Sequence, residues 1–235
     1  MDHDFYDKRN YPIVNVQEGY GDWVRTYEDI VQDEMDLRLL ERLTSPDWSS
    51  PKNILDLACG TGRIGVWLRE RTSAPIDGID ITEEMLTRAR AKNVYRNLTT
   101  GDITQTGLPD ASYDLLTQSL ADEHLPDLTP LYAEAARLIT DDGRFVLVGF
   151  HPYFLMAGIP THFKKSSGET VTIRSYVHQL SDHVKAAHAA GWHLLEMDEG
   201  LIDAEYLRAK PKWEKYAGMP ISFVMVWSAA NTRSA

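Results

Sequence analysis

The stretch ILDLACGTG at residues 54–62 decides the fold of this chain. Its apolar start has the length of a short buried strand, and its glycine-rich end leads into a helical pattern at residues 63–71. Glycines in such a turn let the backbone approach a ligand closely, and the N-terminus of the following helix offers free N–H groups. We therefore predict a strand over residues 53–58, then a ligand-binding loop and a helix.

Strand and helix patterns alternate downstream of this loop. Apolar runs at residues 76–79, 95–99, 113–120 and 144–150 are separated by helical patterns, and the turn signal Asp142-Gly143 precedes the last run. Strands that alternate with helices are typical of a mainly parallel sheet covered on both faces. We therefore predict an α/β fold built on a single Rossmann-like, doubly wound sheet.

The segments that flank this alternation follow other patterns. Apolar side chains at helical spacing predict one helix over residues 21–43, and the residues after it are rich in Ser and Pro, which indicates a linker at 44–52. Beyond residue 150, prolines and glycines interrupt any regular element. Residues 181–190 then predict a helix, and two runs at 194–197 and 222–227 predict an antiparallel pair of strands at one edge of the sheet.

Together these patterns predict a single domain over residues 1–235. Its parts are an N-terminal helical cap (1–50), a cofactor-binding core (51–150), a lid or substrate insertion after the fifth strand (151–180) and the C-terminal part of the sheet (181–230). A chain of 235 residues that is 43% hydrophobic and 25% charged is long enough and apolar enough to bury a normal core.

Charge and composition exclude several classes of function. The 24 Lys and Arg and 35 Asp and Glu residues give a net charge of −11, which argues against a nucleic-acid partner. No apolar stretch approaches the ~18 residues of a membrane span, and the first residues lack the features of a secretion signal. The single cysteine, Cys59, allows no intramolecular disulfide. We expect a cytoplasmic monomer or homodimer without a membrane partner.

The glycines of the loop alone do not identify the cofactor. Gly60, Gly62 and Gly65 also match the dinucleotide fingerprint, so they fit two classes of cofactor. Asp56 helps to separate the two classes. It lies four residues before Gly60, where a carboxylate would repel a pyrophosphate and attract an ammonium group, directly or through water.

Two further acidic residues end predicted strands. Asp80 ends the second strand, where a carboxylate can accept hydrogen bonds from both ribose hydroxyls in either class of cofactor. Asp102 follows the third strand and can accept a hydrogen bond from an adenine amino group while Ile103 covers the ring. Asp is also common at strand ends as a turn former, which is the alternative interpretation of both residues.

The strings DLACGTGRIG, GIDITEEML, GDI and QSLADEHL resemble the successive motifs of the class I S-adenosylmethionine-dependent methyltransferases. The resemblance covers about residues 50–150 and implies S-adenosylmethionine as the cofactor, with S-adenosylhomocysteine as the product. It implies these cofactor contacts: Gly60 and Gly62 with the methionine portion, Asp80 with the ribose, Ile81 and Met85 with the adenine, Asp102 with the adenine amino group, Gln118 with the ammonium through its carbonyl, and Tyr27 over the methionine end. Cys59 belongs to the same loop and is also predicted to line the cofactor site, as a small buried residue rather than a nucleophile.

Histidines follow the fourth and fifth predicted strands. The ligand crevice of a doubly wound sheet lies beyond the carboxyl ends of its strands, so His124 and His151 are candidates to face the transferred methyl group. A histidine can take a proton from a hydroxyl, an amine or an activated carbon. Glu123 or Asp122 can orient that histidine or bind a cationic substrate. Positioning alone is the alternative, because a nucleophilic acceptor needs no base.

The insertion supplies candidate walls for a substrate pocket. Apolar ligands are often bound by aromatic side chains, which cluster here. The predicted substrate-binding residues are Tyr153, Phe154, Met156, His162 and Phe163. Ordinary core under a long loop is the alternative. A metal site of His124, His151, His162 and Glu123 lacks any pair at the helical i, i+4 spacing of a known ligand motif, so we predict no metal.

The sequence thus predicts an enzyme that transfers a methyl group from S-adenosylmethionine to an O, N or C atom of a small molecule, as in specialised metabolism. One alternative is an enzyme of the same fold and cofactor that performs cyclisation or decarboxylation. A nicotinamide-dependent oxidoreductase and a non-catalytic partner subunit are the others. Fold resemblance indicates the cofactor and leaves the acceptor open.

Overall fold

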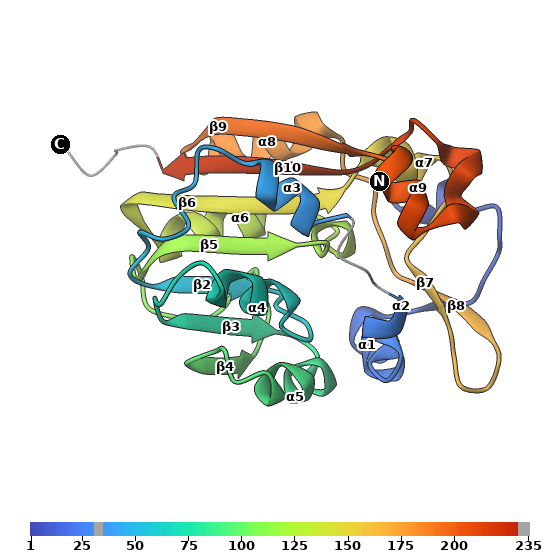
Figure 1. The fold of residues 1–235 in the computed structure, drawn as a ribbon, viewed down its shortest axis with the longest axis horizontal. Coiled ribbons are helices and arrows are strands. Elements are labelled where there is room, and N and C mark those ends of the chain that lie inside the picture. The colour runs from blue at the N-terminus through green and yellow to red at the C-terminus, as the bar shows by residue number, and fades with distance from the viewer. Residues whose placement is uncertain (31–34, 230–235) are drawn as a thin grey trace.

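A seven-stranded sheet forms the centre of the protein (Figure 1). The computed structural model describes residues 1–30 and 35–229. The strands of this sheet are β2 (Ile54–Leu57), β3 (Ile76–Asp80), β4 (Asn97–Thr100), β5 (Tyr113–Ser119), β6 (Ile139–Phe150), β9 (Trp192–Leu201) and β10 (Pro220–Ala229). Their order across the sheet is β4-β3-β2-β5-β6-β10-β9. The pairs from β4 to β6 are parallel, and β10 is antiparallel to both β6 and β9. The predicted doubly wound, mainly parallel sheet with an antiparallel end is confirmed.

One predicted strand differs clearly from the observed one. The strand expected at residues 144–150 begins earlier, at Ile139, and the turn predicted at Asp142-Gly143 falls on an irregular stretch inside β6. The pairing of β5 with β6 is irregular at this point. A Cβ added at Gly143 would come within 2.4 Å of Ile139 Cγ1, four residues earlier, so the chain folds back on itself here and the glycine makes room for that close approach.

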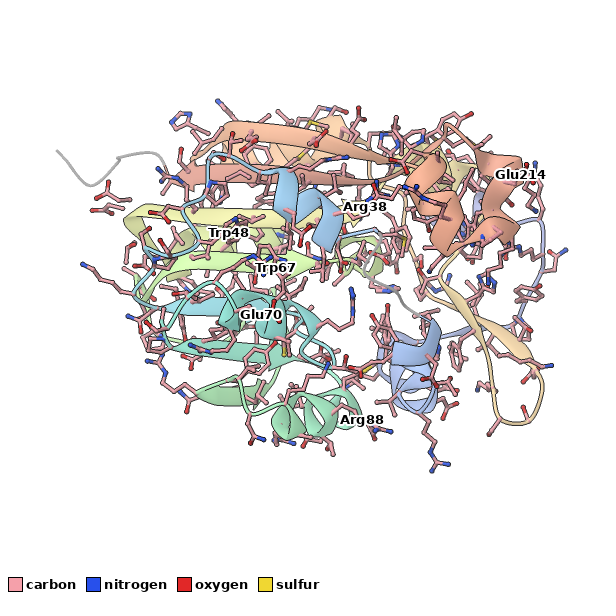
Figure 2. All side chains as sticks on the ribbon, viewed as in Figure 1. Arg38, Trp48, Trp67, Glu70, Arg88 and Glu214 are labelled. Atoms are coloured by element: carbon pink, nitrogen blue, oxygen red, sulfur yellow. The ribbon has the colours of Figure 1, made fainter. Side chains whose placement is uncertain are left out.

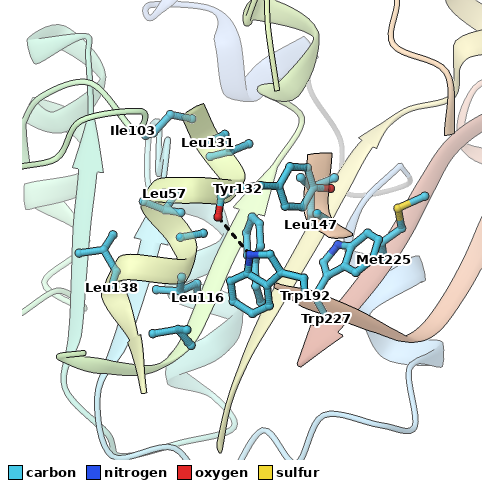
Figure 3. Close-up of a cluster of buried hydrophobic side chains, with 14 of the residues drawn as sticks. Leu57, Ile103, Leu116, Leu131, Tyr132, Leu138, Leu147, Trp192, Met225 and Trp227 are labelled. Atoms are coloured by element: carbon cyan, nitrogen blue, oxygen red, sulfur yellow. Dashed lines mark hydrogen bonds between the residues drawn. The ribbon is translucent and has the colours of Figure 1, made fainter. Parts of the chain in front are cut away.

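Helices cover both faces of the sheet. They are α3 (Leu37–Arg42), α4 (Arg63–Arg69), α5 (Glu83–Ala91), α6 (Thr129–Leu138) and α8 (Leu180–Ala189). On one face, α6 and α8 pack against β2, β5, β6 and β10, and Figure 3 shows this cluster, in which Trp192 Nε1 donates to the Tyr132 carbonyl (3.0 Å). On the other face, α3 and α4 contribute Leu39 and Trp67 to a second cluster.

The N-terminal cap is not the single helix predicted over residues 21–43. The chain forms α1 (Val16–Trp23), α2 (Tyr27–Ile30) and α3, and residues 31–34 lie outside the described residues. The apolar side chains of this segment are buried against different partners, since Trp23 packs with the insertion and Leu39 packs on the sheet. Because these side chains are buried in two different directions, the helix must be interrupted between them, and helical periodicity in the sequence does not reveal such an interruption.

The insertion after β6 joins the N-terminal segment. It contains α7 (Pro152–Met156), β7 (His162–Lys164) and β8 (Thr170–Ile173), and β8 pairs with both β7 and β1 (Ile13–Val14) in a small three-stranded sheet. Gly19 of α1 lies so close to β8 that an added Cβ would be 2.7 Å from Ile173 Cγ1. Figure 1 shows α1, α2, β7 and β8 together beyond the carboxyl ends of β2, β3 and β5.

Short elements complete the chain. They are α9 (Ala204–Ala209) and the 3₁₀ helices η1 (His3–Phe5), η2 (Asp122–His124) and η3 (Pro211–Tyr216). The predicted linker at 44–52 is fixed to the core, because Trp48 packs edge-on against Trp67 with ring centroids 4.8 Å apart (Figure 2). Among the helices of residues 1–30 and 35–229, none is long and apolar enough to cross a membrane.

Candidate active site

A cavity of about 270 Å³ lies at the carboxyl ends of the parallel strands. Its floor consists of residues that directly follow β2, β3, β4 and β5, and α1 and α2 close it with Tyr20 and Tyr27. Ala58 and Leu120, after β2 and β5, have φ values of +54° and +53°, a conformation that non-glycine residues rarely adopt. Such backbone conformations gather at functional sites. None of the described residues that line this cavity is a lysine or an arginine.

The three glycines of the loop have different roles. Gly60 lines the cavity with φ at +53°, and nothing lies within 4 Å of the position where its Cβ would be. Gly62 and Gly65 do not line it. Added Cβ atoms there would come within 2.9 Å and 2.3 Å of the Tyr95 side chain, so these two glycines make room for Tyr95. The structure therefore brings Gly60 to the cavity and leaves Gly62 beneath it.

Asp80 lies at the end of β3 and faces the cavity. Its Oδ2 accepts from the Gly60 N–H and its Oδ1 accepts from the Thr82 N–H, both at 2.8 Å. Burial raises the pKa of this carboxyl, although both hydrogen bonds lower it. Each carboxylate oxygen has a second lone pair, so Asp80 can still accept from a ligand hydroxyl.

The adjoining walls are those expected for an adenine ring. Ile81, Met85 and Ile103 line the cavity with apolar side chains, and Asp102 lies beside them with its carboxylate exposed. Asp102 Oδ1 accepts from the N–H and the hydroxyl of Thr104, at 2.8 and 2.7 Å. A flat ring with an amino group at its edge matches this combination of walls.

Asp56 lies beneath the loop rather than in the cavity. It is 1% exposed, and its two oxygens accept from the hydroxyls of Tyr95 (2.7 Å) and Thr117 (2.9 Å). Burial raises the pKa of Asp56 to about 7. Direct attraction of an ammonium by this side chain is therefore not what the structure shows, because the carboxyl is enclosed by its two hydroxyl partners.

Two other predicted cofactor residues are also buried. Gln118 is 1% exposed. Its side-chain oxygen accepts from Ala121 N (2.8 Å) in the amide orientation that satisfies its neighbours. The next two residues, Ser119 and Leu120, line the cavity instead. Burial raises the pKa of the Cys59 thiol well above its ordinary value, as expected of an inert buried cysteine.

Sequence reasoning missed an ion pair beside the loop. A small recess of about 40 Å³ shares Tyr27, Gly60 and Ser119 with the main cavity and is also lined by Asp36 and Arg63. Asp36 is 1% exposed, pairs with Arg63 and accepts from Ser119 Oγ (2.9 Å). The available signal was the position of Arg63, which is the first helical residue after the glycine loop.

His124 is the predicted histidine that lines the cavity. Its Nε2 lies 2.8 Å from the Tyr20 hydroxyl, and its Nδ1 lies 2.7 Å from the Arg174 carbonyl oxygen. Burial lowers its pKa to about 4. Tyr20 is a second residue that sequence reasoning missed, because it lies just before the helix predicted over residues 21–43.

Glu123 lies behind His124 and does not line the cavity. Its Oε1 is 3.5 Å from His124 Nε2 and accepts from Thr161 Oγ1 at 3.4 Å, and Oε2 has no hydrogen-bond partner among the residues that the structure describes. Burial and the charge of Asp122 raise the pKa of Glu123 well above its ordinary value. Glu123 is thus placed to act on His124 rather than on a ligand.

His151 lies away from the cavity. Its Nδ1 accepts from the Tyr153 N–H at the start of α7, and its Nε2 is 2.8 Å from Glu199 Oε1 of β9. These contacts cap a helix and tie it to the edge of the sheet. The residues after β2, β3, β4 and β5 line the cavity and His151, after β6, does not, so His151 does not meet His124 there.

The predicted substrate-binding residues of the insertion do not line the cavity either. Tyr153 is 48% exposed, and Phe154 is buried in a cluster with Trp213 and Tyr216. Met156 ends α7, and His162 Nδ1 donates to the Pro160 carbonyl oxygen (2.8 Å). Phe163 comes nearest, because it stacks on Trp23, which in turn stacks on Tyr20. Here the alternative of ordinary core describes Phe154 and Phe163. In residues 1–30 and 35–229, no cluster of three or more His, Cys, Asp or Glu side chains is placed to hold a metal ion.

Comparison with known proteins agrees with this fold. Residues 55–147 match the family described as methyltransferase domain. The match spans β2 to β6 and contains the loop, Asp80 and Asp102. Over this core the chain is similar to S-adenosylmethionine-dependent methyltransferases.

Individual relatives are similar over the core. A demethylmenaquinone methyltransferase of Deinococcus radiodurans is 37% identical over 108 residues, which cover 44% of this chain and 45% of the relative. A nocamycin O-methyltransferase of Saccharothrix syringae is 35% identical over 104 residues, covering 41% and 37%. The chain thus matches less than half of the length of these relatives. The crystal structure of an S-adenosylmethionine-dependent methyltransferase from Mesorhizobium loti has a TM-score of 0.67 and 21% identity over 81% of this chain and 95% of that one, which shows a shared fold.

Proposed function

We propose that this protein transfers the methyl group of S-adenosylmethionine to a small-molecule acceptor bound in the cavity. The observation that supports this most is the composition of the cavity wall. Residues of the cofactor motifs form one side, and Tyr20, Tyr27 and His124 close the other. A cofactor held by the first side would present its reactive end towards the second.

The residues present fit the cofactor. Asp80 has lone pairs for ribose hydroxyls, and the apolar wall around Ile81 and Met85 fits an adenine. Gly60 leaves open space where a side chain would intrude. Beyond Gly60, Arg63 and Asp36 offer opposite charges to the carboxylate and ammonium of a methionine. When bound, S-adenosylmethionine supplies an electrophilic methyl group on a positively charged sulfur.

The acceptor is proposed to be an apolar molecule without phosphate. The cavity has Val16, Leu120 and Leu125 on its wall and no lysine or arginine among the described residues that line it, so these side chains offer no positive charge to a phosphate group. Two relatives are named for methylation of demethylmenaquinone and O-methylation of nocamycin. We extend this to the present chain as a preference for cyclic acceptors that carry a hydroxyl group.

Binding and label transfer test this proposal. Calorimetry should show binding of S-adenosylmethionine and S-adenosylhomocysteine but not of NAD. Incubation with methyl-labelled S-adenosylmethionine and a panel of hydroquinones, phenols and enols should place label in a product. Binding of NAD alone would favour the oxidoreductase, whereas cofactor binding with conversion of an acceptor but no label in its product would favour cyclisation or decarboxylation.

A further inference from the structure

Tyr20 and His124 form a hydrogen-bonded pair on the wall of the cavity. Tyr20 extends from α1 and His124 from η2, directly after β5, and both line the cavity. The Tyr20 hydroxyl is 2.8 Å from His124 Nε2, and the two rings meet edge to face with centroids 5.4 Å apart. This pair is therefore within reach of a molecule bound between the cofactor motifs and α1.

The backbone carbonyl of Arg174 fixes the direction of this hydrogen bond. His124 Nδ1 lies 2.7 Å from that oxygen, which can only accept, so Nδ1 carries the proton of a neutral ring. Nε2 is then the bare nitrogen and accepts the proton of the Tyr20 hydroxyl. The Tyr20 oxygen keeps its lone pairs and can accept a proton from a bound molecule.

Segments far apart in the sequence hold the Arg174 carbonyl in place. The Arg174 N–H donates to the Val14 carbonyl of β1 at 2.9 Å, and its guanidinium pairs with Asp2 (3.2 Å) and Asp4 (2.8 Å). The N-terminal segment and the insertion therefore set the tautomer of His124. The same contacts turn the Arg174 charge towards two carboxylates at the surface.

Both members of the pair are neutral near pH 7. Burial lowers the pKa of His124 to about 4 and raises the pKa of Tyr20 well above its ordinary value. The groups that face His124 are Tyr20 from α1, Glu123 and Asp122 from η2 and the Arg174 carbonyl, and Glu123 Oε1 is 3.5 Å from Nε2. A proton that arrives at Nε2 therefore meets oxygen atoms rather than another cation.

We propose that Tyr20 is a catalytic residue, which contacts the acceptor and takes its proton while it passes its own hydroxyl proton to His124. This inference rests on the proposed methyl transfer and deepens it. His124 then acts through Tyr20, one hydrogen bond away from the acceptor. Glu123, behind His124, is a positioning residue for the imidazole.

The step balances without another reagent. A lone pair of the acceptor oxygen forms the new C–O bond at the methyl carbon, and the electron pair of the broken C–S bond remains on sulfur. The acceptor proton moves to the Tyr20 oxygen, and the Tyr20 proton moves to His124 Nε2. His124 returns this proton to solvent after the product leaves.

Acid strengths decide when the proton moves. A free phenol has a pKa of about 10, whereas the pKa of His124 is about 4. Complete transfer of the phenol proton to His124 before methyl transfer is therefore disfavoured roughly a million-fold. As the methyl group bonds to the acceptor oxygen, that oxygen gains positive charge and its proton becomes strongly acidic. We therefore expect proton transfer to accompany methyl transfer, and we expect acceptors with a hydroxyl proton, such as phenols, enols and hydroquinones.

The variant Tyr20→Phe tests this role, because it removes the hydroxyl and keeps the ring. We expect kcat for phenol acceptors to fall by about 100-fold or more, with KM and the affinity for S-adenosylhomocysteine changed by less than about threefold. Tyr132→Phe is the matched control, because Tyr132 bonds to His183 Nδ1 (3.0 Å) in a fully buried pair outside the cavity, and it should keep the wild-type kcat. A raised KM with an unchanged kcat in Tyr20→Phe would show a structural wall and overturn the inference.

Acceptor acidity gives a second measurement. A nitrophenol that is ionised at the assay pH has no proton to lose, so Tyr20→Phe should methylate it at nearly the wild-type rate. The same variant should lose turnover of an unsubstituted phenol. Equal losses for both acceptors would contradict a proton-transfer role.

Nitrogen NMR measures the protonation of the His124 ring nitrogens without turnover, in protein that is labelled with ¹⁵N-histidine and bound to S-adenosylhomocysteine. The variant His124→Gln assigns the signals. We expect a protonated Nδ1 and a hydrogen-bonded, unprotonated Nε2, which shifts towards a free ring nitrogen in Tyr20→Phe. A protonated Nε2, or one unchanged by the substitution, overturns the inference.

If wild type methylates none of the phenols, enols and hydroquinones, the proposed function fails and the role of Tyr20 with it. If wild type methylates them and Tyr20→Phe is equally fast, only the inference fails.

Discussion

The buried carboxyl of Asp56 makes a sharp prediction about stability and pH. Burial raises its pKa from 3.8 to about 7, so the folded protein holds this proton over a pH range in which the unfolded chain has released it. Stability from this group is therefore complete below pH 3.8 and is lost as the pH rises to about 7. At 1.36 kcal/mol for each pKa unit, the whole loss is about 4 kcal/mol, of which about 2 kcal/mol falls between pH 5 and pH 7.

Asp56→Asn removes this titration and keeps the size of the side chain. Its amide can still bond to the hydroxyls of Tyr95 and Thr117, which now hold the carboxyl from two sides. Urea unfolding of wild type and variant at pH 5 and pH 8 measures the effect. We expect the stability of the variant relative to wild type to increase by about 2–3 kcal/mol between these pH values.

The comparison isolates one group among several. Burial also raises the pKa of Asp80 and Glu123, which contribute pH dependence of the same sign to both proteins. The difference between wild type and variant cancels those contributions. Equal pH dependence in the two proteins would refute a buried, protonated Asp56, and so would a variant that loses stability relative to wild type as the pH rises.

Three further predictions concern the loop and the histidines. Asp80→Ala should weaken binding of S-adenosylhomocysteine by at least about 100-fold, because charged hydrogen bonds contribute about 1.5–3 kcal/mol each; wild-type affinity by calorimetry, with an unchanged circular dichroism spectrum, would refute the ribose contact. Gly62→Ala should lower the free energy of unfolding by about 1–3 kcal/mol, because φ is +85° and the new Cβ would lie 2.9 Å from the Tyr95 ring; unfolding in urea checks this, and an unaffected midpoint counts against the packing role. His151→Gln should cost about 1 kcal/mol through the lost cap of α7 and leave kcat within about twofold; a kcat reduced 100-fold would restore His151 to the active site.

Local patterns predicted the sheet well for a physical reason. A strand buried on both faces shows its apolar run in consecutive residues, so Ile54–Leu57 and Ile76–Asp80 appear in the sequence where the structure has them. Helical periodicity is less informative, because it records that a side chain is buried and not what buries it. Trp23 and Leu39 share one apparent helix, yet one packs on the insertion and the other on the sheet.

The candidate site divides in the same way. Gly60, Asp80 and Asp102 were predictable, because residues that follow parallel strands meet at one edge of the sheet. Gly62 and Asp56 were assigned to the cofactor. In the structure, Tyr95, more than thirty residues away, packs against Gly62 and donates a hydrogen bond to Asp56. No local sequence pattern predicts these contacts with Tyr95.

The stretch ILDLACGTG therefore determined the strand and the loop by itself, since both depend on residues next to one another. Tertiary structure alone decided which of His124 and His151 lines the cavity. His124 follows β5, which lies beside β2, whereas His151 follows β6, which lies one strand further away and leads into α7. It also decided that Tyr20 meets His124. That contact depends on how α1 crosses the ends of the strands and on the Arg174 carbonyl, which β1 and β8 hold in place.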